Sequence, residues 1–235
     1  MIERRPLQKL GYFNHGWLNT WHHFSFADYH DPLRVHWGGL RVWNDDIIQP
    51  GTGFPPHPHA DMEIVTYVLK GAITHHDHLG NKGRTPAGDV QVMSAGTGIQ
   101  HAEYNLEAEP THIFQIWILP TRRGGHPSWG NKAFPKGDRA GRFVAVASGF
   151  DEDTDALPIR SLSRVLGATL KAGQTTEYAI GNERWGYLVP ATGRAEVNGI
   201  QLETRDGAAI HDEAVIKVTA LEDTEVGLVD APGLH

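Results

Sequence analysis

The sequence predicts an all-β fold made of two stacked antiparallel β-barrels, and three observations lead to this expectation. Gly and Pro are frequent, with 27 and 14 copies in 235 residues, and they separate short runs rich in Val, Ile, Thr and aromatic side chains. No stretch keeps a helical period of apolar residues over three turns. Many short strands between closely spaced turns are typical of a β-sandwich or barrel.

The expected strands are spread over both halves of the chain. A faint internal repeat relates residues 67–90 to residues 187–208, since each reads as strand, turn, strand, turn, strand beginning at a Tyr. A repeat of this kind indicates two copies of one barrel. The expected strands are Glu63–Leu69, Asp89–Met93, His112–Leu119, Arg142–Ala147, Trp185–Val189 and Val215–Thr219.

The two halves differ in chemistry. Of the 15 histidines, 13 lie at or before His126, and the stretch Arg122–Gly141 is rich in Gly, Pro and basic residues, which is typical of a linker. We therefore expect an N-terminal domain over residues 1–135, carrying the site, and a C-terminal domain over residues 136–235 without one.

Composition excludes several classes of function. The 21 basic and 28 acidic side chains give a net charge of 21 − 28 = −7, so a nucleic-acid-binding surface is not expected. No apolar run is long enough for a membrane helix, and the N-terminus has no apolar core of a secretory signal. Cys is absent, which excludes disulfides, thiolate catalysis and zinc fingers. These features predict a cytoplasmic protein without a membrane partner.

Two pairs of metal-ligand side chains carry the strongest local chemistry. His57 and His59 are two residues apart, so in a strand they face the same side. His101 and Glu103 repeat the spacing after a Gly-rich turn. On neighbouring strands the pairs would offer three nitrogens and one oxygen, which suits Fe(II), Mn(II), Ni(II), Cu(II) or Zn(II). Glu63 shares the parity of His57 if that strand continues unbroken.

Simpler interpretations apply to other polar clusters. A lone His is more often a surface or hydrogen-bonded residue than a ligand, whereas two paired sets favour a metal site. In the stretch His75–His78, alternation puts His76 and His78 on one face and His75 and Asp77 on the other, so one pair is expected to be exposed and a second metal site is disfavoured. The stretch Asn44–Asp46 could help to frame the site, but turn chemistry is the simpler interpretation.

These motifs resemble the cupin motifs, and the N-terminal half resembles the pirin family, whose bacterial members include quercetin 2,3-dioxygenases. The resemblance covers most of residues 15–120 and is looser beyond. The matching stretches are Trp21–Tyr29, Leu40–Asp46, His57–Gly71 and Met93–Glu103.

The resemblance implies a bicupin, two jelly-roll barrels with a metal in the first only. It implies the ligand set His57, His59, His101 and Glu103 around one divalent transition metal, with Fe(II) favoured and Zn, Ni, Cu and Mn as alternatives. Glu63 would then either hold an imidazole N–H or an ordered water behind the ligands, or be a buried structural residue.

The resemblance also implies an enzyme that cleaves flavonols such as quercetin with O2 and releases carbon monoxide. Glu103 would be the catalytic base, with Glu63 as the second choice, and the substrate a small flavonol-like aromatic. Motif neighbourhood and strand parity make Phe54, Met93, Gln115 and Trp117 candidates for lining the pocket, although a place in the core is the simpler interpretation of each. The alternative is a metal-containing redox sensor or regulatory protein that binds a protein partner without robust catalysis.

Overall fold

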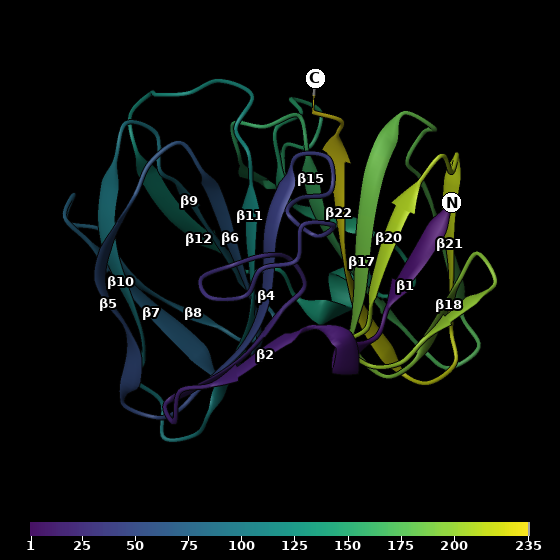
Figure 1. The fold of residues 1–235 in the computed structure, drawn as a ribbon, viewed down its shortest axis with the longest axis horizontal. Helices are drawn as coiled ribbons and strands as arrows, with labels where there is room; N and C mark the ends of the chain where they lie inside the picture. The colour runs from purple at the N-terminus through teal and green to yellow at the C-terminus, as the bar shows by residue number, and fades with distance from the viewer. Residues whose placement is uncertain (235) are drawn as a thin grey trace.

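The strands are short because Gly and Pro interrupt them, as at Gly71, whose φ of +75° turns one strand into the next in a backbone region that favours glycine. The computed structural model describes residues 1–234, and within them the predicted all-β class is confirmed (Figure 1). In the first half the strands are β1 (Ile2–Arg5), β2 (Gly11–Asn14), β3 (Leu18–His22), β4 (Leu40–Ile48), β5 (Thr52–His59), β6 (Glu63–Lys70), β7 (Ala72–Asp77), β8 (Lys82–Pro86), β9 (Val90–Ser94), β10 (Ile99–Asn105), β11 (Thr111–Ile118) and β12 (Ser128–Lys132). In the second half they are β13 (Val144–Ser148), β14 (Leu157–Pro158), β15 (Arg164–Leu170), β16 (Thr175–Ala179), β17 (Arg184–Thr192), β18 (Ala195–Val197), β19 (Ile200–Leu202), β20 (Gly207–His211), β21 (Val215–Ala220) and β22 (Thr224–Pro232), and two 3-10 turns lie at η1 (Leu7–Lys9) and η2 (Lys136–Arg139).

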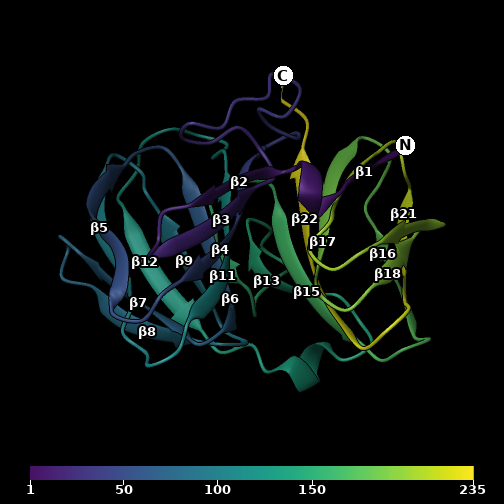
Figure 2. The same ribbon diagram turned by 60° about the horizontal axis from the view of Figure 1, so that its bottom comes forward.

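The sheets repeat one architecture in both halves, as expected for a bicupin (Figures 1 and 2). In the first half, a seven-stranded sheet in the order β12-β9-β6-β11-β4-β3-β2 accompanies a four-stranded sheet, β5-β10-β7-β8. In the second half, the order β1-β20-β17-β22-β15-β13-β14 accompanies β16-β21-β18-β19. Apart from the parallel pair β13–β14, the paired strands named above run antiparallel.

The first strand of the chain belongs to the sheet of the second half. β1 pairs with β20, with Ile2 opposite Ile210 and Arg5 opposite Gly207. The domain boundary at residues 135/136 stays a prediction, and β1 is a segment that crosses it. Within residues 1–234, no helix is long and apolar enough to span a membrane.

The two barrels differ in what fills them. The seven-stranded sheets share an apolar core in which Trp43 lies 5.7 Å from Tyr187, measured between ring centroids. The second barrel contains a large cluster of aliphatic side chains that includes Leu188 and Ile216. The first barrel has only smaller apolar clusters among the described residues, one of them around Ile113. Its inner surface is therefore available for polar groups.

Buried charges also join the halves. The Tyr67 hydroxyl donates a hydrogen bond to Glu225 across the interface at 2.7 Å, and Arg139 and Lys136 donate to the same carboxylate at 3.3 and 2.5 Å. Glu225 is 4% exposed, so these cations compensate a charge that has lost its water.

Two expectations from the sequence are corrected here. Asn44–Asp46 is not a turn, because it lies in the middle of β4 and is buried. The strand that carries His59 ends at that residue, and Asp61 at φ +50° separates it from Glu63, which begins β6. Glu63 therefore does not continue the alternation of His57 and His59.

Candidate metal centre

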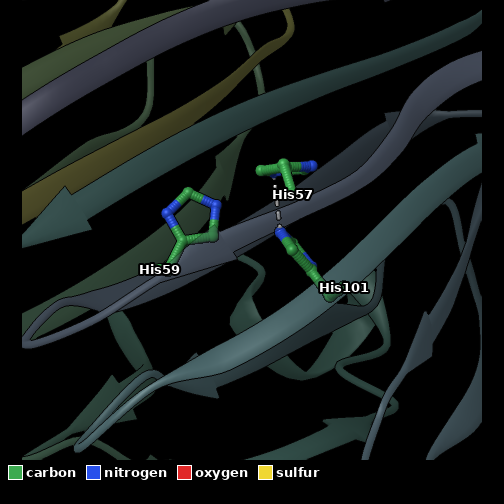
Figure 3. A group of neighbouring side chains, drawn as sticks. All are labelled: His57, His59 and His101. Carbon is green, nitrogen blue, oxygen red and sulfur yellow. Dashed lines mark hydrogen bonds between the residues drawn. The ribbon is translucent and has the colours of Figure 1, made fainter.

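Three imidazoles meet inside the first barrel (Figure 3). β5 and β10 are neighbours in the four-stranded sheet, and His57 lies directly opposite His101. Their Nε2 atoms are 3.0 Å apart, and the His59 ring centroid lies 4.7 Å from that of His57 and 5.0 Å from that of His101. One nitrogen from each ring lies within 4.8 Å of the others. The spacing that places His57 and His59 on one face thus brings them together.

The backbone of β5 is adapted to this arrangement. Its register against β10 shifts between His101 and Glu103, where Pro55 and Pro56 interrupt regular pairing, and such bulges commonly re-aim side chains. The Pro55 carbonyl lies 2.7 Å from Nδ1 of His57 and can only accept, so Nδ1 carries the proton. The Nε2 lone pair of His57 is then free to face the other two rings.

The three rings fit a divalent metal ion. Burial, reinforced by the neighbouring imidazoles, lowers the pKa of His59 and of His101 to about 3, so both rings are neutral and offer lone pairs at neutral pH. The Nε2 atoms of His57 and His101 are 3.0 Å apart, close enough for one ion to bind both.

A buried pair on β7 lies behind His101. His75 approaches Nδ1 of His101 at 3.4 Å through its own Nδ1, and its Nε2 lies 2.8 Å from Asp77. The His75 ring stacks on Trp129 at 4.6 Å with an interplanar angle of 7°. Asp77 also accepts from the Asn81 side chain at 2.9 Å, and these hydrogen bonds outweigh burial and lower its pKa. Asp77 therefore anchors an imidazole that orients His101.

The other face of this stretch is solvated. His76 and His78 are exposed, whereas His75 and Asp77 are buried, as the alternation predicts. The sequence does not reveal that the buried pair supports His101, because this depends on β7 pairing with β10.

Glu103 is fully buried and held by two amides. The side-chain nitrogens of Gln91 and Gln115 donate to its two oxygens at 2.5 and 2.9 Å. Each amide is oriented by a donor on its own oxygen, from Thr85 at 3.0 Å and from Trp117 at 3.2 Å. Burial raises the pKa of Glu103, while the donated hydrogen bonds stabilise its ionised form.

The position of Glu103 relative to the imidazoles bears on its predicted roles. Its carboxylate lies within 4.8 Å of nitrogens of both His75 and His101, a grouping separate from the one that joins His101 to His57 and His59. His101 thus belongs to both groups. Glu103 as the fourth ligand and as the catalytic base stays a prediction.

Glu63 has a structural environment. It accepts from the Ser94 hydroxyl at 2.5 Å and from the backbone N–H of Arg160, in the second half of the chain, at 3.0 Å. Burial raises its pKa. Of the two interpretations of Glu63, the structure favours the buried structural one.

A cavity of about 320 Å³ opens beside His57 and His59. Of the residues expected to line a pocket, Phe54, Gln115 and Trp117 do so. Met93 does not, because it packs in a separate apolar cluster with Ile64 and Ile99. The remaining lining residues are His15, Leu18, Thr20, His22, Phe26, Ala27, Asn44, Asp46, Pro55 and Pro56, several of which no sequence motif marked.

Comparison with known proteins agrees with this architecture. The family model described as pirin matches residues 3–118, and that described as the quercetinase C-terminal cupin domain matches residues 145–231. A pirin-like protein of Caulobacter vibrioides is 70% identical, covering 98% of this chain and 100% of its own length, and the quercetin 2,3-dioxygenase of Escherichia coli K12 is 42% identical, covering 99% of each. The crystal structure of the bacterial pirin YhhW from Escherichia coli in complex with nickel(II) superposes with a TM-score of 0.93 at 41% identity, over 100% of both chains. The chain therefore belongs to the pirin family.

Proposed function

We propose that this protein is a metal-dependent dioxygenase that cleaves flavonols such as quercetin with O2 and releases carbon monoxide. The observation that carries the proposal is the cavity that borders His57 and His59 and has Phe54 and Trp117 among its walls. A volume of about 320 Å³ suits one small aromatic molecule, since small-molecule sites span roughly 300–1,000 Å³. A pocket of this size with aromatic side chains among its walls, beside a metal site, fits a flavonol.

His57, His59 and His101 would hold the metal, with Glu103 as the fourth ligand. We favour Fe(II), as the resemblance implies. Ni, Zn, Cu and Mn are alternatives, because nitrogen and carboxylate donors without sulfur suit all of these metals. The nickel(II) bound to the Escherichia coli pirin supports a divalent metal. When bound, the ion would supply Lewis-acid and redox chemistry toward the substrate and O2.

The protein's own groups have two tasks in this scheme. Phe54 and Trp117 exclude water and align the flat rings of the substrate. Glu103 accepts the proton of the flavonol 3-hydroxyl, and the amides of Gln91 and Gln115 keep its carboxylate in place for that transfer. A relative named quercetin 2,3-dioxygenase, 42% identical along nearly the whole chain, supports this assignment.

The test is quercetin consumption in air with detection of carbon monoxide, after loading the metal-free protein with each metal separately. We expect Glu103→Gln to lower turnover by about 10²- to 10⁴-fold, the usual contribution of a positioned base. Glu177→Gln, at an exposed position of β16 in the other barrel, is the matched control and should leave turnover unchanged. Metal content is measured for each protein.

Each alternative result has a definite meaning. Stoichiometric metal without turnover would contradict catalysis and favour a regulatory protein. Full turnover in Glu103→Gln would contradict the role of Glu103 as the base. Absence of metal binding under any loading would contradict the metal centre itself.

A further inference from the structure

A polar row crosses the inner face of the seven-stranded sheet of the first barrel. The strand register places its members side by side: His22 lies opposite Asn44, Asn44 opposite Gln115, Gln115 opposite Thr66, and Thr66 opposite Gln91. All five are buried, with at most 8% of any one exposed. A row of polar side chains inside a barrel is costly unless each group finds a partner.

The side chains at one end of the row are hydrogen-bonded to Glu103. Gln115 and Gln91 donate to Glu103, and Thr66 lies 3.4 Å from the same carboxylate. This end of the row therefore positions the carboxylate of Glu103, which lies beside the histidine cluster.

The side chains at the other end of the row have polar atoms without hydrogen-bond partners. His22 and Asn44, with the next cross-strand pair Thr20 and Asp46, line the cavity beside the histidine cluster. The atoms Thr20 Oγ1, His22 Nδ1, Asn44 Oδ1 and Asp46 Oδ1 are buried, and within hydrogen-bond distance and angle none has a partner in the described part of the chain, although the Thr20 hydroxyl lies near enough to the Asp46 carboxyl to counter the rise of its pKa. Because nearly all buried polar atoms have a partner, four unpaired atoms along one cavity wall indicate a ligand that supplies them.

The chemistry of these atoms defines that ligand. Asn44 offers an amide oxygen and Asp46 a carboxyl oxygen, both acceptors, while the Thr20 hydroxyl can donate or accept. Burial lowers the pKa of His22 to about 4, so its ring is neutral and offers one donor and one acceptor. A wall rich in acceptors fits a ligand that presents O–H groups.

Aromatic rings frame the same wall. Phe26 lies edge-to-face with His22 at 5.1 Å and with Trp117 at 5.3 Å, measured between ring centroids. A ligand reaching from His59, whose ring packs against Trp117 at 4.9 Å, to the unpaired atoms therefore passes aromatic surface. The occupant is then a flat aromatic molecule whose hydroxyl groups face these unpaired atoms.

We propose that Thr20, His22, Asn44 and Asp46, which we call the hydroxyl site, recognise phenolic hydroxyl groups of the substrate and select polyhydroxylated flavonols. This inference rests on the proposed flavonol function and specifies which side chains recognise hydroxyl groups of the substrate.

The test compares two probes that share the flavonol ring system and the 3-hydroxyl. Quercetin carries additional phenolic hydroxyls, and 3-hydroxyflavone carries none. Their dissociation constants are measured without O2 on the nickel-loaded protein, so that no turnover intervenes. Thr20→Val and Asn44→Leu replace polar atoms of the hydroxyl site with apolar groups of similar size. Thr176→Val, at a buried Thr of the other barrel, is the matched control.

We expect each hydroxyl-site variant to weaken quercetin binding about tenfold, the effect of losing one good hydrogen bond, and to change 3-hydroxyflavone binding by less than about twofold. Thr176→Val should change neither. Circular dichroism and nickel stoichiometry establish that each variant folds. If either variant fails to fold, the wild-type protein still tests the proposal, because quercetin must bind at least about tenfold tighter than 3-hydroxyflavone.

The outcomes distinguish failure of the hydroxyl site from failure of the flavonol function. Binding of both probes with equal affinity, or variants that weaken both alike or neither, would overturn the hydroxyl site and leave flavonol binding intact. Binding of neither probe to the wild-type protein would overturn the flavonol function, and the hydroxyl site with it.

Discussion

Neighbouring aspartates on β4 should respond to pH in opposite ways. Asp46 faces the cavity, and burial, with the nearby charges of Asp45 and Glu103, raises its pKa to about 7. Asp45 faces the other half of the chain. Burial opposes its ionisation, but hydrogen bonds from His112 and Arg205, both at 2.5 Å, outweigh this and lower its pKa.

The perturbation is Asp46→Asn in the metal-free protein. Between the ordinary pKa of 3.8 and about 7, folded Asp46 keeps a proton that the unfolded chain has released, so the free energy of unfolding falls as the pH rises through this window. A shift of about 3 units corresponds to about 4 kcal/mol. The variant cannot ionise, so it should be more stable than the wild type by up to about 4 kcal/mol near pH 8 and by less than about 1 kcal/mol near pH 4.

Asp45→Asn is the matched control on the same strand, and its sign is opposite. Because the pKa of Asp45 is lowered, its ionised form adds stability that is present above about pH 4 and lost at lower pH. The variant should lose about 3–5 kcal/mol at neutral pH, since it breaks a buried ion pair with Arg205, and less in acid.

The assay is urea unfolding followed by tryptophan fluorescence after metal removal, at several pH values between about 3 and 8. A stability difference between Asp46→Asn and wild type that stays constant over this range would refute the reasoning, because only ionisation of Asp46 makes the difference depend on pH. A destabilised Asp46→Asn at pH 8 would refute it as well.

The remaining predictions concern the support of the metal centre and the junction of the halves. Asp77→Asn should weaken nickel binding about 10- to 100-fold in a competition titration by loosening the imidazole behind His101, whereas His76→Ala on the exposed face should bind nickel normally. Glu225→Gln should lower the free energy of unfolding by about 3–5 kcal/mol because it leaves Arg139 buried without its ion pair; an unchanged transition in calorimetry would show that this interface charge is dispensable.

Local spacing predicted the parts of the site that depend on one strand. His57 and His59 meet because alternate residues of a strand share a face, and His101 joins them because its strand pairs directly with theirs. The expected strands agree with the structure to within a few residues, as at Glu63–Leu69 against β6. The strands and the shared face of His57 and His59 follow from short-range periodicity, whereas the position of His101 depends on the pairing of β5 with β10.

The hydroxyl site could not be predicted in this way. Asn44–Asp46 has the composition of a turn, so local chemistry favoured a turn over a place beside the site, yet the segment lies in β4 and lines the cavity. The polar row forms only after five strands pair in the right register, and β3 and β9 are far apart in the chain. The environment of Glu63 likewise depends on Arg160 in the other half.

The contrast between the barrels explains how the fold tolerates such a site. The second barrel is filled with aliphatic side chains, and another apolar core lies between the seven-stranded sheets. Their burial offsets the cost of unpaired polar atoms in the first barrel. Stability and binding therefore oppose each other at one residue: Asp46→Asn should stabilise the metal-free protein at pH 8 and weaken quercetin binding. A variant that gained stability without losing quercetin affinity would show that the carboxylate of Asp46 has no part in recognition.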